Sequence, residues 1–173
     1  MKKVVLLFVG VLGAIWAFTR MPVLSSREAN AFSCSNEVAK LVVEKSNKVM
    51  KIYDTSGCVM KTYTVRTGLN RGPKQCEGDK RTPEGTYHIV EKRNSKYVKF
   101  LELDYPQAKD IARANELGCN PGNAIGIHYY NKEYTDDPST LDGSLGCVTV
   151  WDKDEIQEIN RLVKVGTKVE ITL

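Results

Sequence analysis

Between residues 37 and 65, apolar and polar residues alternate in three short runs that are separated by turn residues. The runs read EVAKLVVEK, KVMKIYD and CVMKTYTV, and the breaks between them are SN and TSG. Alternation of this kind is typical of a strand that buries one face, and Ser, Asn and Gly are typical of the turns between strands. The pattern therefore predicts a meander of three antiparallel strands.

The remainder of the chain predicts five more strands and two helices. The strands are TYHIVEK, YVKFLEL, NAIGIHYY, GCVTVW and TKVEITL; the helices are YPQAKDIARANELG and DKDEIQEINRLVKVG. Asp152 and Glu155 form a capping box at the start of the second helix, and Gly118 stands where a left-handed residue ends the first. Strands dominate, so the predicted fold class is mainly β with two short α-helices.

Residues 1–31 are expected to direct export rather than to join the fold. MKK is a short positive segment, and residues 4–18 form the uncharged apolar run VVLLFVGVLGAIWAF. This run has the length of a long signal-peptide core or of a short membrane span, and ANA at residues 29–31 fits a small-x-small cleavage site. Residues 1–31 are therefore either a signal peptide or an inner-membrane anchor through residues 4–18. Both alternatives place the rest of the chain in the periplasm or cell envelope.

The composition and charge of the chain are those of a globular domain that does not bind nucleic acid. Hydrophobic residues make up 42% of the chain and charged residues 27%, which is ordinary for one globular domain. The net charge of +4 comes from scattered lysines and arginines, without a long basic run. No nucleic-acid-binding motif is present, so nucleic acid is not an expected partner.

The cysteine count points to two disulfides and one free thiol. Five cysteines are an odd number, which leaves at least one without an intramolecular partner. In a tight hairpin around the SN turn, the numbers of opposing residues sum to about 93, which places Cys34 beside Cys58. A bond between them would close a loop of about 25 residues and contribute about 3 kcal/mol in the chain-entropy model. Cys76 and Cys119 lie in glycine-containing loops and form the second candidate pair, which leaves Cys147.

Cys147 and His128 lie at the edges of strand-like segments joined by one polar loop. Thiol-based acyl transfer needs a thiolate, a base and donors for the oxyanion, and a neighbouring imidazole can lower the pKa of a cysteine thiol. Gly146 leaves room for a carbonyl group to approach the backbone N–H groups around Cys147. A plain alternative stays open, because a cysteine flanked by valine is often a core residue. A metal site is not expected, since the chain has no C-x-x-C pair.

Two stretches carry a resemblance to a known family. GIHYYNKEYTDDPSTLDGSLGCVTV resembles the active-site motif of the L,D-transpeptidase (YkuD-like) catalytic domain family, in which a histidine is followed after a gap by Ser/Thr-x-Gly-Cys. The matching positions are His128, Ser144, Leu145, Gly146 and Cys147. DKRTPEGTYHI resembles the Lys-x-Thr-Pro-x-Gly segment that leads into a core strand of the family.

The resemblance implies a fold, a reaction and a set of roles. The fold would be a YkuD-like β-sandwich or barrel-like catalytic domain over residues 37–173. Cys147 would be the nucleophile, His128 the general base, and the backbone around Ser144 would orient the imidazole. N–H groups near Gly146 and Cys147 would bind the oxyanion.

The implied substrate is a peptidoglycan stem peptide. The thiol would attack the L,D bond before the terminal D-alanine, and a second stem, a protein lysine or water would resolve the thioester. The implied reaction uses no metal and no other cofactor. Leu145 and Tyr129 flank the reacting residues, and Arg81, next to TPEG, is a candidate to meet a substrate carboxylate.

The sequence departs from the family motif at three positions, which keeps other functions open. Tyr129 stands where many members have glycine, Leu145 replaces a frequent histidine, and Thr149 replaces a frequent arginine or asparagine. These departures resemble a divergent branch, so an L,D-hydrolase acting on peptidoglycan or on wall-attached protein is the alternative within the same chemistry. The alternative of another class is a non-catalytic, disulfide-stapled module that binds the cell wall.

Overall fold

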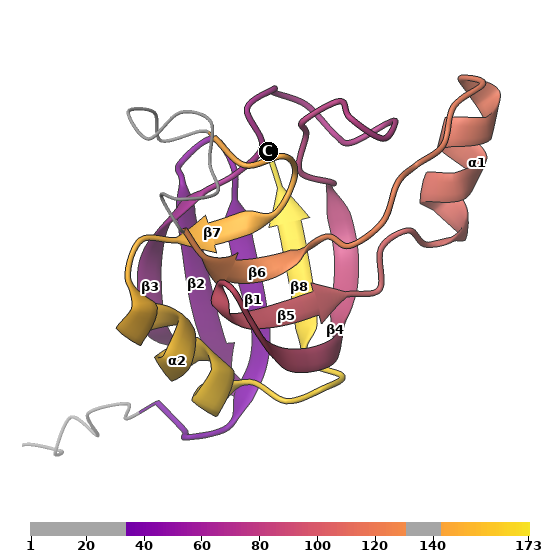
Figure 1. The fold of residues 1–173 in the computed structure, drawn as a ribbon. Helices are drawn as coiled ribbons and strands as arrows, with labels where there is room; N and C mark the ends of the chain where they lie inside the picture. The colour runs from indigo at the N-terminus through magenta and orange to yellow at the C-terminus, as the bar shows by residue number, and fades with distance from the viewer. Residues whose placement is uncertain (1–33, 131–142) are drawn as a thin grey trace, which may run out of the picture. The chain divides into compact units, whose positions relative to one another are not determined.

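In the part of the chain that the structure describes, the alternating segments form eight strands that close into a barrel, and two helices accompany them (Figure 1). The computed structural model describes residues 34–130 and 143–173, so the expected signal peptide or anchor lies outside the described residues. The elements are β1 (Val38–Glu44), β2 (Val49–Asp54), β3 (Val59–Arg66), β4 (Gly85–Ser95), β5 (Val98–Leu103), α1 (Ala108–Glu116), β6 (Gly126–Tyr129), β7 (Val148–Val150), α2 (Lys153–Leu162) and β8 (Lys168–Thr172). The predicted fold class is confirmed.

The first hairpin has the register that its turn predicts. Leu41 lies opposite Ile52 and Val43 lies opposite Met50. All four side chains are fully buried in the barrel, and burial of such a side chain contributes about 1.5–3 kcal/mol. A shift of the register by one residue would turn this whole set toward solvent, so the apolar pattern fixes the pairing.

Both expected cysteine pairs are bonded. The Cys34–Cys58 bond joins the segment before β1 to the segment that precedes β3. The Cys76–Cys119 bond ties the loop after β3 to the segment that follows α1. Cys147 is the one cysteine without a disulfide.

The strand order around the barrel is β1-β2-β3-β7-β6-β5-β4-β8, and β8 returns to β1. Two of its contacts are parallel, those of β1 with β8 and of β6 with β7. The β6–β7 contact matters most for the site, because it brings together segments that the polar loop separates in the sequence. Strand β7 also pairs with β3, where Arg66 lies opposite Thr149.

Helix α2 begins where its capping box predicts. The Asp152 carboxylate accepts the N–H of Asp154 at 2.8 Å, and the Glu155 carboxylate accepts the N–H of Asp152 at 3.1 Å. Ile156 and Ile159, one turn apart on the same face, are fully buried in the barrel core. The helix therefore packs one apolar face on the barrel, next to β5, β6 and β7.

Helix α1 is shorter than the sequence predicted and projects from the barrel (Figure 1). The backbone of Gln107 is still extended, and its N–H donates to the Asp110 carboxylate at 3.0 Å, which starts the helix at Ala108. Gly118 has a positive φ of 69°, as expected for the residue that ends a helix. The buried Tyr87 hydroxyl donates to Asp110 at 3.1 Å and connects this helix to β4.

Within residues 34–130 and 143–173, the helices are too short or too polar for any of them to traverse a lipid bilayer.

Candidate active site

The parallel pairing of β6 and β7 places His128 and Cys147 on the same face of the sheet. Ile127 lies opposite Val148, and His128 lies opposite Thr149. Ile127 and Val148 are fully buried in the core. Because side chains alternate along a strand, His128 and Thr149 point to the other face, and Cys147 shares that face as the residue two before Thr149.

On this face, a cavity of about 510 Å³ brings the predicted catalytic residues together. His128, Ser144 and Cys147 all contribute to its wall, as does Leu145. The other lining residues are aromatic, cationic or small: Arg66, Arg93, Ser95, Lys96, Tyr97, Phe100, Ala124, Tyr130, Gly143 and Thr149. The described lining contains no acidic side chain, so the cavity suits an anionic ligand.

Cys147 also borders a second cavity, of about 360 Å³. Ala124, Leu145 and Cys147 line both cavities. The remaining lining residues of the second cavity come from two loops: Lys74, Glu77, Gly78, Lys80, Gly122, Asn123 and Ile125. The thiol therefore lies between two cavities, one lined by cationic side chains and the other by side chains of both charges.

The Ser144 side chain holds the turn that carries Cys147. Its hydroxyl donates to the carbonyl of Cys147 at 2.6 Å and accepts the N–H of Gly146 at 3.1 Å. Its own carbonyl accepts the N–H of Leu69 at 3.1 Å. Ser144 thus fixes the backbone around the thiol through its side chain, whereas the sequence motif suggested that its backbone orients the imidazole.

Glycine is required at position 146 for two separate reasons. Its φ is +141°, a conformation that residues with a side chain rarely adopt. A Cβ atom at this position would lie 2.9 Å from the carbonyl oxygen of Arg81 and 3.0 Å from Cδ1 of Ile125. The turn before Cys147 therefore packs directly on the backbone of another loop.

His128 is a buried imidazole enclosed by aromatic rings. Its ring centroid lies 4.1 Å from that of Tyr97 and 5.5 Å from that of Phe100. Nδ1 lies 2.8 Å from the carbonyl oxygen of Tyr129, and since that oxygen can only accept, Nδ1 carries the proton and Nε2 is the basic nitrogen. Burial lowers the pKa of His128 to about 4, against the smaller opposing effect of that carbonyl, so the ring is neutral at pH 7.

The Cys147 thiol is also neutral at rest. Burial raises its pKa to about 11, although the backbone of Gly126 and the charge of Lys74 act in the opposite direction. The charge of Glu102 raises the pKa further. Sγ donates to the carbonyl oxygen of Ala124 at 3.6 Å. The site therefore holds a neutral thiol and a neutral imidazole, and proton transfer between them would accompany attack on a substrate.

Two of the expected substrate-binding residues lie outside both cavity linings. Tyr129 packs against the barrel core, and the Lys153 ammonium lies 5.7 Å from the centre of its ring. Arg81 contributes its backbone, because its carbonyl contacts the Gly146 turn and its N–H donates to Asp79 at 3.0 Å.

The site also contains residues that no sequence motif marks. The Arg66 guanidinium lies over the Tyr130 ring at 3.6 Å and near the Trp151 ring at 5.2 Å. The hydroxyls of Tyr130 and Thr149 are buried without a hydrogen-bond partner within the described part of the chain. Strand alternation predicts that Tyr130 points to the same face as His128, which lies two residues earlier. Arg66 could be found only from the pairing of β3 with β7.

One group of potential metal ligands, Asp54 with Cys34 and Cys58, has a structural explanation. The two sulfur atoms are bonded to each other. The carboxylate of Asp54 accepts backbone N–H groups of Ser35, Ser56 and Cys58 at 2.6, 2.9 and 2.8 Å. The Ser56 hydroxyl, which donates to the same carboxylate at 2.8 Å, and these N–H groups hold its pKa at about 2 although the side chain is buried, and they use the oxygens that a metal would need.

Comparison with known proteins adds one family and a group of similar folds. The sequence model of the L,D-transpeptidase catalytic domain (YkuD) matches residues 39–171. No curated protein sequence matches the chain significantly.

Solved structures share the fold at low sequence identity. The helical cell shape determining protein Pgp2 of Campylobacter jejuni has 24% identity and a TM-score of 0.60, over 80% of this chain and 49% of that one. An L,D-transpeptidase of Enterococcus faecium has 16% identity and a TM-score of 0.53, over 79% and 50%. One from Stackebrandtia nassauensis has 16% identity and a TM-score of 0.52, over 84% and 62%. The chain thus spans about half to three fifths of the length of these proteins.

Proposed function

The chain belongs to the L,D-transpeptidase catalytic domain family (YkuD), and from this premise we propose that it is an exported cysteine acyltransferase acting on peptidoglycan stem peptides. The observation that carries the proposal is that Cys147, the one cysteine without a disulfide, lines the same cavity as His128. Both stand at matching positions of the family motif. The processes served would be cell-wall biogenesis and the maintenance of cell shape.

In the proposed mechanism, Cys147 is the nucleophile and His128 is the base. Sγ attacks the carbonyl of the L,D bond that precedes the terminal D-alanine, and Nε2 of His128 takes the thiol proton. As the C–N bond breaks, the imidazolium returns this proton to the leaving amine, which departs as D-alanine. An acceptor amine or water then attacks the thioester carbonyl, and the thiol is regenerated.

The oxyanion of each tetrahedral intermediate needs N–H donors near the thiol. The N–H of Gly146 already donates to Ser144. We therefore assign the principal oxyanion donor to the backbone N–H of Cys147, with Ser144 and Gly146 holding its orientation. This refines the expectation from the motif, which named the N–H groups of both residues.

Two cavities at one thiol support a reaction with two substrates. The cationic residues Arg66, Arg93 and Lys96 line the larger cavity, which suits the carboxylates of a donor stem. The smaller cavity carries both signs of charge, from Lys74, Glu77 and others, which suits an acceptor that bears an amine and a carboxylate. We assign the donor to the larger cavity and the acceptor to the smaller one.

A hydrolase is the second candidate, and the departures from the motif favour it. Leu145 is 64% exposed at the junction of the cavities, where the family frequently has histidine. Thr149 replaces a frequent arginine or asparagine and leaves its hydroxyl without a partner among the described residues. A weakly defined acceptor site would allow water to resolve the thioester.

Mass spectrometry of defined muropeptides tests both candidates. The full chain is incubated with a tetrapeptide stem, with and without a second stem, and the variant Cys147→Ala is the matched control. We expect cross-linked products with loss of D-alanine from the wild type and none from the variant. Hydrolysed stems alone would replace the transferase with the hydrolase, and equal products from both proteins would refute a role for Cys147.

A thiol-reactivity measurement separates an enzyme from a non-catalytic wall-binding module. A carbapenem is incubated with the non-reduced protein, and the site of acylation is mapped by peptide mass spectrometry. We expect one adduct, on Cys147, that is absent from Cys147→Ala and weakened in His128→Gln. Binding to cell-wall glycan without any adduct would favour the module.

Export is supported by the two disulfides and by the apolar segment at residues 4–18. Fractionation of cells that express the full chain tests it. We expect the protein in the envelope fraction, with either Phe32 as the mature N-terminus or the intact segment as an anchor. A cytoplasmic protein with five reduced cysteines would overturn this part of the proposal.

A further inference from the structure

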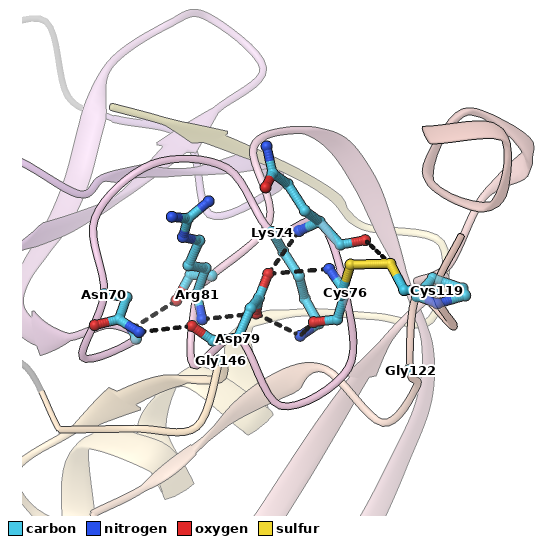
Figure 2. A network of polar contacts seen from close by, with 12 residues as sticks. Asn70, Lys74, Cys76, Asp79, Arg81, Cys119, Gly122 and Gly146 are labelled. Atoms are coloured by element: carbon cyan, nitrogen blue, oxygen red, sulfur yellow. Dashed lines mark hydrogen bonds and ion pairs between the residues drawn. A yellow bond between two sulfur atoms is a disulfide. The ribbon is translucent and has the colours of Figure 1, made fainter. Parts of the chain in front are cut away.

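The loop between β3 and β4 is organised around one carboxylate, that of Asp79 (Figure 2). One oxygen accepts the N–H groups of Gln75 and Cys76 at 2.6 and 3.1 Å. The other accepts the ammonium of Lys74 at 2.9 Å and the N–H of Arg81 at 3.0 Å. Burial alone would raise the pKa of Asp79, but these donors hold it below its ordinary value, so the carboxylate is charged. We call residues 70–82 the Asp79 loop.

The Asp79 loop is fixed on one side to the region around α1. The Cys76–Cys119 disulfide crosses to the segment after the helix, and the N–H of Glu77 donates to the carbonyl of Asn120 at 2.6 Å. The Arg113 guanidinium donates to the carbonyl of Lys74 at 3.1 Å. On the other side, the Arg81 carbonyl faces the Gly146 turn so closely that a Cβ atom at position 146 would lie 2.9 Å from its oxygen. The loop thus braces the backbone that carries Cys147.

Lys74 in this loop carries a charged side chain that is almost completely buried, with only 4% of it exposed. Its ammonium donates to Asp79 and, at 3.0 Å, to the carbonyl of Cys76. It lines the second cavity together with Cys147. A buried ammonium is costly unless it is paired, and an apolar side chain could fill the same volume at no such cost. The retention of a cation in this position therefore indicates that its charge acts on a group beside the cavity.

We propose that Lys74, clamped by Asp79, is a positioning residue for the chemistry of Cys147: its buried ammonium stabilises the negative charge that the sulfur acquires when it ionises and attacks. This inference rests on the proposed role of Cys147 as the nucleophile. Lys74 does not touch the reacting atoms, and its effect acts through the field that it imposes on them. In agreement, the charge of Lys74 lowers the pKa of the Cys147 thiol, against the larger effect of burial.

Other charges also act on the thiol and must be held constant in a test. The charge of Glu102 on β5 acts on it directly, and the other titratable or charged groups that line the two cavities are Arg66, Arg93, Lys96, His128, Glu77 and Lys80. Glu102 acts against Lys74, because its negative charge raises the pKa of the thiol. Glu102 is already paired with Arg93 at 2.8 Å, which limits its influence.

The test is the rate of alkylation of Cys147 by iodoacetamide between pH 7 and 9 in the non-reduced full chain. Lys74→Gln removes the charge and keeps hydrogen-bond donors for Asp79 and the Cys76 carbonyl. We expect its rate to fall about tenfold at each pH, equivalent to a rise of about one unit in the pKa of the thiol. Lys74→Arg, which keeps the charge, is expected to stay near the wild type. Lys164→Met removes an exposed cation that lines neither cavity and is expected to have no effect.

Asp79→Asn distinguishes an electrostatic role from loop disruption. Removal of the carboxylate charge leaves Lys74 uncompensated, so the alkylation rate is expected to rise, opposite to Lys74→Gln. If both variants change the rate in the same direction, or if Lys74→Gln matches the wild type, the proposal is wrong. Alkylation needs no stem peptide, so this result is independent of the muropeptide assay that tests the proposed function.

Discussion

At the scale of single residues, the site is defined by two neutral groups whose pKa values are displaced in opposite directions. Burial lowers the pKa of His128 to about 4 and raises that of Cys147 to about 11. An ion pair of thiolate and imidazolium is thus not the resting state. In the proposed mechanism, attack on a substrate couples the loss of the thiol proton to its uptake by Nε2, as in general base catalysis.

The lowered pKa of His128 makes the stability of the fold depend on pH. In the unfolded chain His128 titrates near 6.5, so below that pH the unfolded state binds a proton that the folded state excludes until the pH falls through about 4. Stability is therefore lost as the pH falls through this window, by ~2.5 kcal/mol between pH 7.5 and 4.5. Urea unfolding at the two pH values measures it. His128→Gln is the control, and its loss is expected to be smaller by that amount, since carboxylates contribute equally to both proteins.

The positive φ of Gly146 and the atoms packed around it predict how a substitution by alanine would affect stability. We expect Gly146→Ala to lower the free energy of unfolding by ~2–4 kcal/mol, through backbone strain and the contact with Arg81, and to change the reactivity of Cys147. Gly166→Ala is the matched control: its φ is +88°, but a Cβ there meets open space, so only the strain of ~1 kcal/mol should remain. Thermal unfolding and alkylation rates check both. Equal losses would show that the contact with Arg81 is unimportant.

At the scale of elements, the β4–β5 hairpin forms the aromatic cover of the imidazole. Tyr97 stands next to Val98, whose φ of +68° is unusual for a β-branched residue. This turn places the Tyr97 ring over His128, with Phe100 also close to the imidazole. A strained conformation of this kind persists only when the surrounding structure enforces it. Here it occurs next to Tyr97, whose ring contacts His128, the proposed base.

Removal of this cover should bring the pKa of His128 back toward its ordinary value. We expect Tyr97→Ala to admit water to the imidazole and raise its pKa from about 4 toward 6.5, because burial is the main cause of the displacement. Nuclear magnetic resonance titration of the ring protons measures the change. Tyr97→Phe keeps the ring and is expected to behave like the wild type; an unchanged pKa in Tyr97→Ala would mean that other residues bury the imidazole.

Local sequence patterns determine the elements but not the pairing of distant strands. Alternation, the SN turn and the capping box at Asp152 predicted strands, the first register and the start of α2, because each depends on residues close in sequence. The contacts of β7 with β6 and with β3 join distant segments, and no local pattern encodes them. For this reason His128 and Cys147 were found through their chemistry, whereas Arg66 was missed.

At the scale of the whole molecule, the two disulfides serve different parts of the domain. Cys34–Cys58 closes a sequence separation of 24 at the start of the barrel, and Cys76–Cys119 closes one of 43 around the Asp79 loop. In the chain-entropy model each contributes about 3–4 kcal/mol to stability. Only the second is connected to the turn that carries Cys147.

Replacing each pair by serines should therefore separate stability from reactivity. We expect both double variants, Cys34→Ser with Cys58→Ser and Cys76→Ser with Cys119→Ser, to unfold at lower urea concentration. The second alone should change the alkylation rate of Cys147, since it releases the loop that holds Lys74 and the Arg81 carbonyl. Equal alkylation rates in the two variants would indicate that the Asp79 loop keeps its position without the bond.

The raised pKa of Cys147 also has a consequence for the thiol in the oxidising compartment to which we propose that the chain is exported. With a pKa of about 11, only about one sulfur in ten thousand is a thiolate at pH 7. Thiolates, not thiols, exchange with disulfides and react with peroxides. Once the barrel has formed, we therefore expect the Cys147 thiol to exchange slowly with the two disulfides and to react slowly with oxidants. The burial that raises the pKa of this thiol would thus also protect the sulfur atom on which the proposed reaction depends.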